Sequence, residues 1–266
     1  MIVCAVVAAL VQEAGGVKVF SNKQMVDQYG PLVIRNNTAR YNYGPGLWSD
    51  GGGWNISYIS NTLTDNALAG IHHEISFHAT IAGNYVSGNC WRYAPWHAGG
   101  PSPWSGYCGQ ITLSTSQNVT IRDNTIEVDP TAAGNYAAVA MYQDPRGTDH
   151  HTNRTFYCRN NVVRHNHILF KSDGGGHIRT GIVAFTNQNG STWAHANMSM
   201  DDNVYSLPRS AVGGNLWWWC DGAAVPSPPP PGGGPPLTHA PCKGLTFTEF
   251  QSKGQELHST LHPVGE

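Results

Sequence analysis

The chain has 266 residues and nearly balanced charge, with 15 basic and 17 acidic side chains and a formal net charge of −2 at pH 7. No basic patch indicates a nucleic-acid partner, and no acidic block indicates a disordered tail. The chain contains 31 glycines and lacks long stretches with helical hydrophobic period, which favours short strands joined by tight turns.

The chain begins with the apolar stretch MIVCAVVAAL. This stretch has the small-residue composition of a signal-peptide core, but no basic residues precede it, and it is too short to cross a bilayer. Two interpretations stay open: a truncated first repeat or a weak secretion signal. No other segment is long and apolar enough to span a membrane, so we expect no membrane partner.

Two asparagines five residues apart recur after short stretches in which Val or Ile alternates with polar residues. The recurring positions are Asn37/Asn42, Asn61/Asn66, Asn84/Asn89, Asn124 (with Asp129 in the second place) and Asn161/Asn166. Alternation predicts strands with one buried face, and repetition near this period predicts stacked coils. Asparagine suits the left-handed turns between strands, and its amide can hydrogen-bond along the stack. The sequence therefore predicts an all-β parallel β-helix.

Each early repeat continues into a further apolar strand that carries polar side chains. Counted from the marker asparagine, Trp48 and His72 both lie eleven residues on, and Asp50 and Glu74 both lie thirteen on. Because stacked coils lie about 4.8 Å apart, we expect Trp48 to stack on His72 and Asp50 on Glu74 on an outer face. By the same alternation, His73 points inward or sits at a bend.

Several segments carry a family resemblance. They are EAGGVKV (13–19), NYGPGLWSD (42–50), GIHHEIS (70–76), STSQNVTIRDNTI (114–126), DNVYSL (202–207), WWW (217–219) and FTEFQSKGQE (247–256). In these segments the chain resembles right-handed parallel β-helix repeat proteins of the pectate-lyase-like, or pectin-lyase, fold. The resemblance implies a right-handed single-stranded parallel β-helix over residues 1–205 and a C-terminal cap over 206–266.

The chain departs from the family pattern in four places. Residues 90–108 form an insertion rich in Trp and Pro, residues 145–155 form a second, and residues 224–241 place a Pro/Gly tract in the cap. The EAGG segment normally lies well inside such a domain, whereas here it begins at Glu13. We therefore expect N-terminal coils to be missing.

The paired carboxylates suggest two kinds of chemistry. Neighbouring carboxylates repel, so one pKa should rise, which is the arrangement of an acid/base pair in sugar hydrolysis. Alternatively, Asp50 and Glu74 hold Ca²⁺, and His72 removes a uronate proton. The catalytic candidates are Asp50, Glu74, His72 and His73, although His73 also fits an interior residue and His72 a solvated one. Trp48 is the candidate platform for a sugar ring.

Aromatic residues of the first insertion and of a later strand extend the candidate substrate-binding set, which is Trp48, Trp91, Trp96, Trp104, Tyr142 and Gln143. The insertion either walls a sugar-binding cleft or forms a lid over its own aromatic rings. Its ends, Cys90 and Cys108, are placed to form a disulfide, as are Cys220 and Cys242 around the cap insertion. The alternative is a set of free, buried thiols.

These observations favour a monomeric, secreted or cell-wall-associated protein that acts on a polysaccharide or glycan as a lyase, glycoside hydrolase or epimerase. The competing interpretations are a non-catalytic carbohydrate-binding protein and a purely structural one. The absence of a basic row counts against a polyuronate lyase, because such substrates are anionic.

Overall fold

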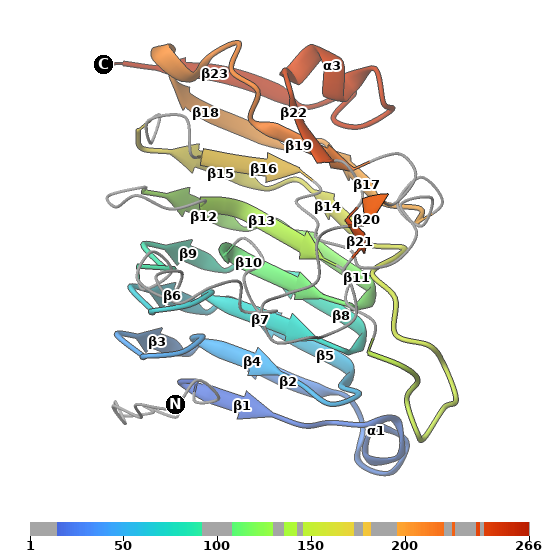
Figure 1. Ribbon diagram of the computed structural model, residues 1–266. Helices are drawn as coiled ribbons and strands as arrows, with labels where there is room; N and C mark the ends of the chain where they lie inside the picture. The colour runs from blue at the N-terminus through green and yellow to red at the C-terminus, as the bar shows by residue number, and fades with distance from the viewer. Residues whose placement is uncertain are drawn as a thin grey trace.

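The computed structural model describes residues 15–91, 108–129, 136–142, 146–172, 178–181, 196–220, 225–226, 238–239 and 242–265. Strands dominate this part of the chain, and they stack in layers from the N-terminal to the C-terminal end (Figure 1). The predicted all-β class agrees with this arrangement. Within the described residues, no helix is long and apolar enough to cross a membrane.

Three large sheets form the body of the protein, and each takes every third strand of the stack. Sheet A contains β1 (Val17–Val19), β4 (Leu47–Ser49), β7 (Ile71–Glu74), β10 (Cys108–Ser114), β13 (Tyr136–Tyr142), β16 (Ile178–Gly181), β19 (Trp217–Cys220) and β22 (Cys242–Leu245). Sheet B contains β2 (Leu32–Arg35), β5 (Trp54–Ile59), β8 (Phe77–Ala82), β11 (Gln117–Arg122), β14 (Val162–Arg164) and β17 (Ser199–Asp201). Sheet C contains β3 (Thr38–Arg40), β6 (Thr62–Thr64), β9 (Tyr85–Ser87), β12 (Thr125–Val128), β15 (His167–Phe170), β18 (Val204–Pro208) and β23 (Thr260–Val264).

The remaining elements are short. They are α1 (Lys23–Tyr29), the 3-10 turn Arg209–Ala211, the hairpin β20 (Val225–Pro226) and β21 (Thr238–His239), and α3 (Phe247–Gln251). All neighbouring strands of the large sheets pair in parallel except β19 and β22, which are antiparallel. The C-terminal segment thus turns back on the stack.

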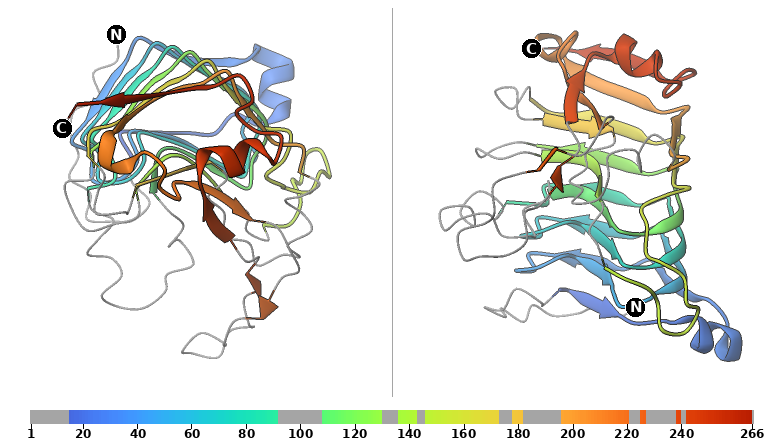
Figure 2. Two further views of the ribbon diagram at one scale, coloured as in Figure 1. Left: turned by 90° about the horizontal axis from the view of Figure 1, so that it is seen from above. Right: turned by 45° about the vertical axis from the view of Figure 1, so that its right-hand side comes forward.

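The register of the paired strands places similar apolar residues above one another inside the stack. In sheet A, Leu47 pairs with Ile71, Ile71 with Ile111, and Ile111 with Val139, and all four are fully buried. The view along the stack shows the successive coils superimposed around this interior (Figure 2). No single coil could bury its apolar side chains alone, so the core exists only because the coils share a register.

Buried asparagine amides run through the stack as a ladder. Each backbone N–H donates to the side-chain oxygen of the next member at 2.8–3.0 Å, in the order Asn37, Asn61, Asn84, Asn124, Asn166 and Asn203. A second, shorter ladder contains Asn42, Asn66, Asn89 and Gln110. The predicted stacking of asparagines along the axis is therefore confirmed.

Two predicted ladder positions were wrong. Asn124 bonds to Asn166 rather than Asn161. The reason is that Thr125 of β12 pairs with His167 of β15, which aligns Asn124 with the second asparagine of the next marker pair. Asn161 instead accepts from the N–H of Val119 in sheet B. Gln110, not Asp129, extends the second ladder, because the coil after Asn89 contains the insertion and re-enters sheet A at β10.

Local backbone geometry explains why asparagine follows a particular kind of residue. The positions before the ladder asparagines adopt left-handed φ angles, as at Ser60 (53°), Asp123 (56°), His165 (54°) and Asp202 (55°). Short polar side chains and His tolerate this region better than β-branched residues do. Each such residue turns the chain from sheet B to sheet C.

Cysteine pairing is partly as predicted. Cys90 and Cys108 form a disulfide with a Cα–Cα distance of 5.8 Å, which joins the ends of the first insertion. Cys158 is free and buried, and burial raises the pKa of its thiol to about 12. The backbone register of β19 and β22 places Cys220 opposite Cys242, while their side chains lie outside the described part. A second disulfide therefore stays a prediction.

Replacing Asn66 with Ala tests the second ladder. Its amide donates to Asn89 and to the carbonyl of Ala39, and its oxygen accepts from Asn42. Because removal leaves buried partners unsatisfied, we expect the free energy of unfolding to fall by about 3 kcal/mol. Urea denaturation of Asn66→Ala measures this loss, and Asn37→Ala, at the half-buried end of the first ladder, is the comparison. Equal losses in the two variants would contradict the argument.

The cysteine assignment predicts a specific peptide map. Digestion without reduction should give one linked peptide containing Cys90 and Cys108 and another containing Cys220 and Cys242. Cys158 should react with an alkylating reagent only after denaturation, because its thiol is buried. Mass spectrometry of the digest checks all three, and alkylation of Cys220 and Cys242 in the native protein would exclude the second disulfide.

Candidate functional site

A row of side chains crosses the outer face of sheet A near its N-terminal end. Strand pairing aligns Lys18, Trp48, His72 and Thr112 on successive strands β1, β4, β7 and β10. The rings of Trp48 and His72 lie parallel, 5.6 Å apart with an interplanar angle of 8°. The predicted stacking of these two residues is confirmed, and equal spacing from the marker asparagines was the signal that found it.

Trp48 is less accessible than a sugar platform requires. The ammonium nitrogen of Lys18 lies 3.7 Å from the indole centroid, on the β1 side, while His72 covers the β7 side. Only 6% of Trp48 is exposed. The expectation of an open ring face is therefore corrected, because the same register that aligns the column also stacks both faces of the indole.

Glu74 is the most perturbed acidic group of this region. Its side chain is 1% exposed, accepts a hydrogen bond from the indole N–H of Trp48 at 3.0 Å, and lies 3.2 Å from the Arg146 guanidinium. Burial and the nearby charge of Asp50 raise its pKa to about 7, against the opposing effects of Arg146, Trp48 and Lys18. A carboxyl group with this pKa can give or take a proton near neutral pH.

Asp50 lies one residue beyond β4 and forms its own ion pair. Its carboxylate is 2.9 Å from the ammonium group of Lys18. Asp50 is close enough to Glu74 to raise the pKa of that carboxyl. The two acids thus interact as predicted, yet each has a separate cation, Lys18 for Asp50 and Arg146 for Glu74.

This donor set does not fit Ca²⁺. Calcium prefers several ionised or carbonyl oxygens around one centre. Glu74 is buried, its raised pKa favours the protonated form, and both acids already contact cations. We therefore assign no metal to Asp50 and Glu74.

The two histidines have opposite positions. His72 faces outward and is partly exposed, and burial lowers its pKa to about 4, so the ring is neutral at physiological pH. His73 is fully buried, with Ser49 Oγ at 2.6 Å and the Tyr58 hydroxyl at 3.4 Å from its Nδ1. His73 lies inside the stack, as the strand alternation predicted, and in this position it cannot touch a substrate on the outer face.

Arg146 reaches Glu74 from an insertion. We call residues 146–158 the bridging segment, because it begins at Arg146 on Glu74 and packs Phe156 on Phe77 of β8 with ring centroids 5.1 Å apart. In the sequence, Arg146 is one of several scattered arginines. Nothing in its local sequence distinguishes it from the other arginines, so only the packed structure reveals the pairing.

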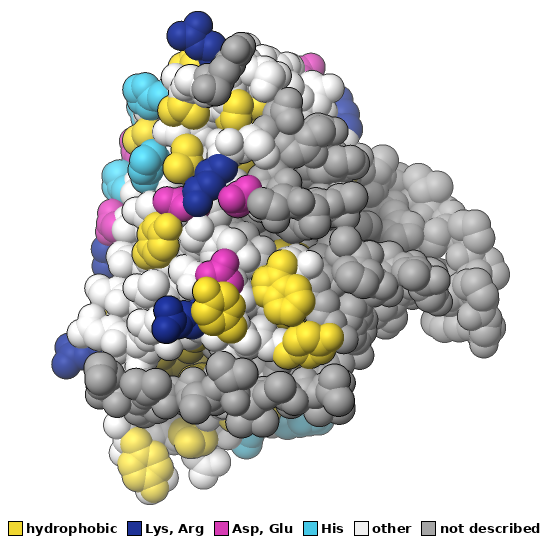
Figure 3. Space-filling view, turned by 90° about the vertical axis from the view of Figure 1, so that its left-hand side faces the viewer, with side chains coloured by type: hydrophobic (Ala, Val, Ile, Leu, Met, Phe, Trp, Pro, Cys, Tyr) yellow, Lys and Arg dark blue, Asp and Glu magenta, His cyan; other side chains and the backbone are white. Residues whose placement is uncertain are grey.

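Trp91 is the one aromatic residue of the first insertion that the structure describes. It is 42% exposed, donates its indole N–H to the Asp65 carbonyl at 2.8 Å, and meets the Tyr43 ring edge to face at 5.9 Å. The exposed rings of Tyr41 and Tyr85 also border sheet C. Figure 3 shows this side of the molecule, where hydrophobic side chains lie among charged ones.

The other aromatic and polar candidates cannot be placed. Trp96, Trp104, Gln143 and the side chain of Tyr142 lie outside the described residues. Tyr41, Tyr43 and Tyr85 were missed by the sequence analysis. Their signal was present, because Tyr41 and Tyr43 flank the marker Asn42 and Tyr85 directly follows the marker Asn84.

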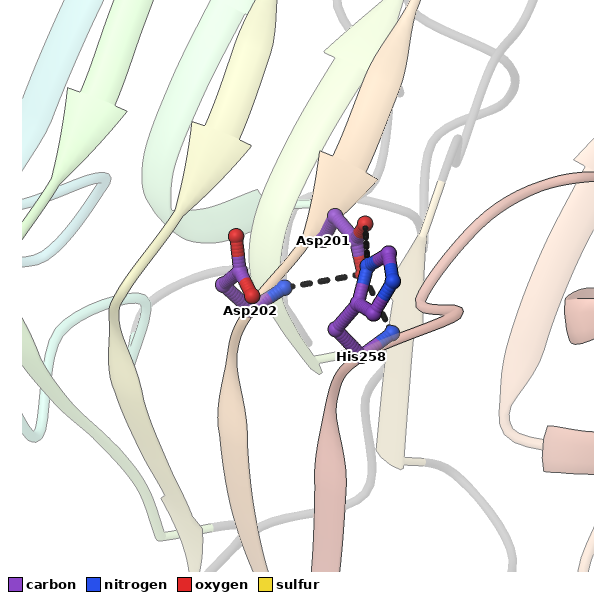
Figure 4. Close-up of side chains that lie close together, drawn as sticks. All are labelled: Asp201, Asp202 and His258. Atoms are coloured by element: carbon purple, nitrogen blue, oxygen red, sulfur yellow. Dashed lines mark hydrogen bonds and ion pairs between the residues drawn. The ribbon is translucent and has the colours of Figure 1, made fainter.

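A separate cluster lies at the C-terminal end of sheet B. Asp201, Asp202 and His258 place one potential metal-ligating atom each within 4.8 Å of one another (Figure 4). Asp201 accepts from both the backbone N–H and the imidazole Nδ1 of His258 at 2.7 Å, and this pairing raises the pKa of His258. The pairing ties the segment before β23 to β17, which explains the cluster as an ion pair.

Comparison of the chain with protein-family models, curated proteins and solved structures found no match. The family resemblance therefore rests on the residues quoted for it.

The raised pKa of Glu74 predicts a pH-dependent stability difference. Above its unfolded pKa near 4.5, the native state holds this proton more tightly than the unfolded chain does, so stability from Glu74 is present at low pH and lost as pH rises through about 7. The free energy of unfolding of wild type relative to Glu74→Gln should fall by up to about 3 kcal/mol from pH 4.5 to 7.5. Urea denaturation of both proteins over this pH range measures the difference. If the free energy of unfolding of wild type and of Glu74→Gln changes equally with pH, the raised pKa of Glu74 is refuted.

Proposed function

We propose that the protein is an extracellular right-handed parallel β-helix that acts on a polysaccharide at the outer face of sheet A. The observation that carries the proposal is the Glu74 carboxyl, whose pKa of about 7 suits proton transfer, in the neighbourhood of the Asp50–Lys18 ion pair. Two acids with different environments are the usual basis for separate acid and base roles. The residue resemblance supports the handedness, and the Cys90–Cys108 disulfide supports an oxidising compartment.

In this proposal, Glu74 gives a proton to, or removes one from, the sugar at the reacting bond. The indole N–H of Trp48 holds one carboxyl oxygen, and Arg146 lies at the other. A sugar carboxylate or hydroxyl that binds the Arg146 guanidinium in place of Glu74 would make the Glu74 carboxyl accessible to the substrate. Lys18 and Arg146 provide two cations beside the acids, and the neutral His72 ring lies on the same face.

A non-catalytic glycan-binding protein is the second candidate, and a specific observation favours it. Trp48 and Glu74 are buried and already paired, whereas Trp91, Tyr41 and Tyr85 are exposed on the side of sheet C. Exposed aromatic rings bind sugar faces without any reaction. A purely structural role is the third possibility.

Glu74→Gln separates these candidates. It keeps the shape of the side chain but removes the titrating proton, so turnover should fall at least about 100-fold. Release of reducing ends and the ultraviolet absorbance of unsaturated products, across a polysaccharide panel, measure turnover. Asp123→Asn, a surface substitution in a left-handed turn that Asn also accommodates, is the control.

Three outcomes distinguish the enzyme, the glycan-binding protein and the structural protein. Loss of turnover in Glu74→Gln alone supports the enzyme, and glycan binding by wild type without turnover supports the binding protein. A panel that shows neither turnover nor binding supports a structural role and refutes the proposal.

A further inference from the structure

Tripeptides of the form Asn-x-Ser/Thr recur at turns of the described chain. They begin at Asn36, Asn55, Asn118, Asn153 and Asn197, and another, at Asn189, lies outside the described residues. Such a tripeptide is the acceptor for N-linked glycosylation in secreted proteins. Because a glycan is bulky and needs a surface position, the fold decides which of these asparagines could carry one.

The turn conformation explains why asparagine is present, so the acceptor role has to be argued from the surroundings. All five described acceptor asparagines have left-handed φ angles between 49° and 59°. Asparagine tolerates this conformation better than most residues do. The repeat therefore selects asparagine at these turns with or without a glycan, and the room around each side chain is what separates them.

Asn118 is enclosed between neighbouring coils. Its Oδ1 accepts a hydrogen bond from Asn160 Nδ2 of the next coil at 3.1 Å. On the other side, the pairing of β8 with β11 aligns Asn118 with His78. Asn118 is half-buried, and neighbouring coils lie only about 4.8 Å apart. A sugar attached to Asn118 would disrupt this column of stacked turn residues.

Asn36 and Asn197 lie at opposite ends of sheet B and are exposed. Asn36 directly follows β2, the first strand of that sheet, and Asn197 precedes β17, the last. Asn197 donates its Nδ2 to Asn160 at 3.2 Å. Because a glycosylated amide keeps one N–H, this hydrogen bond is compatible with a glycan. Thr38 and Ser199, which complete the two tripeptides, are exposed as well.

Asn55 and Asn153 are the other exposed acceptors. Asn55 lies on β5, in a left-handed turn at the entry to sheet B. Asn153 lies in the bridging segment, where its backbone N–H donates to the Asp149 carbonyl at 2.8 Å. The guanidinium of the next residue, Arg154, lies 5.3 Å from the Trp54 ring centroid and helps to dock this turn. Docking thus leaves the Asn153 side chain on the surface.

We propose that the folded protein carries N-linked glycans at Asn36, Asn55, Asn153 and Asn197 and none at Asn118. The Asn Nδ2 attacks the anomeric carbon C1 of an oligosaccharide that is carried on a lipid pyrophosphate. The Nδ2–C1 bond forms, the bond from C1 to the pyrophosphate oxygen breaks, and the lipid pyrophosphate leaves. The amide gives up one proton to a base of the transferring enzyme, and nothing is oxidised or reduced.

The proposal rests on the extracellular location in the proposed function, which the Cys90–Cys108 disulfide supports. It does not depend on any reaction at Glu74. None of the four asparagines lies on a strand of sheet A. Glycans at these positions would therefore be attached outside the strands that carry Trp48 and Glu74.

Site-resolved mass spectrometry tests the proposal on the full chain, secreted from a eukaryotic host and purified as the folded fraction. Treatment with a peptide:N-glycosidase in heavy-oxygen water converts each glycosylated Asn to a labelled Asp. We expect label at the four exposed asparagines and none at Asn118. Label at Asn118, or no label at any of the four, overturns the proposal. An unlabelled site among the four overturns it for that site.

Thr38→Ala provides a variant with a matched control. It removes the acceptor hydroxyl of the Asn36 tripeptide but keeps Asn36, so the protein should lose the mass of one glycan. Thr62→Ala is the control, because Thr62 pairs with Thr38 across β3 and β6, is equally exposed, and completes no acceptor tripeptide. Thr38→Ser should keep the glycan. An unchanged mass in Thr38→Ala excludes Asn36, and site mapping of the wild type decides if that variant is not secreted.

Glycan occupancy and turnover fail independently. A secreted protein that turns over a polysaccharide but carries no label at the four sites refutes this inference alone. Label at the four sites without turnover refutes only the enzymatic proposal. Glu74→Gln should keep the labelling pattern of the wild type, because no acceptor tripeptide contains Glu74.

Discussion

Register between coils is the constraint on which the rest of the structure depends. A slip of one residue would move every inward side chain to the outer face, and the buried asparagine ladders oppose such a slip. Each interior member of the ladders donates its amide both to the next member and to a backbone carbonyl, as Asn84 does to Asn124 and Tyr58. Mis-stacking would therefore leave several buried polar groups unsatisfied at once, at a cost of about 1–3 kcal/mol each. The same register aligns Lys18, Trp48 and His72.

The end of the stack is closed by polar groups that replace another coil. The last ladder member, Asn203, donates to the buried Glu256 carboxyl, which also accepts from the Tyr205 hydroxyl. Burial raises the pKa of Glu256. In addition, β23 pairs with β18 and covers that edge of sheet C. An open sheet edge is a template for association, so these contacts limit growth of the stack by a further chain.

The bridging segment links features that are distant in the sequence. Its first residue, Arg146, contacts Glu74, and its turn around Asp149 reaches the second coil and α1. Arg146 offsets part of the burial cost that raises the pKa of Glu74. The segment therefore affects both the electrostatics of sheet A and the surface beside α1, although it is itself outside the repeated strands.

The sequence alone determined the stacked, mostly β architecture, because the period of Val, Ile and Asn records contacts that recur at fixed spacing. It also determined that Trp48 lies on His72, since this follows from counting along equivalent strands, whereas it left His73 either pointing inward or at a bend. Only the tertiary structure decided that Trp48 and Glu74 are buried and that Asn166, not Asn161, continues the ladder. Arg146 and Arg154 come from an insertion without a period, and their partners depend on where that insertion packs, which no local pattern encodes.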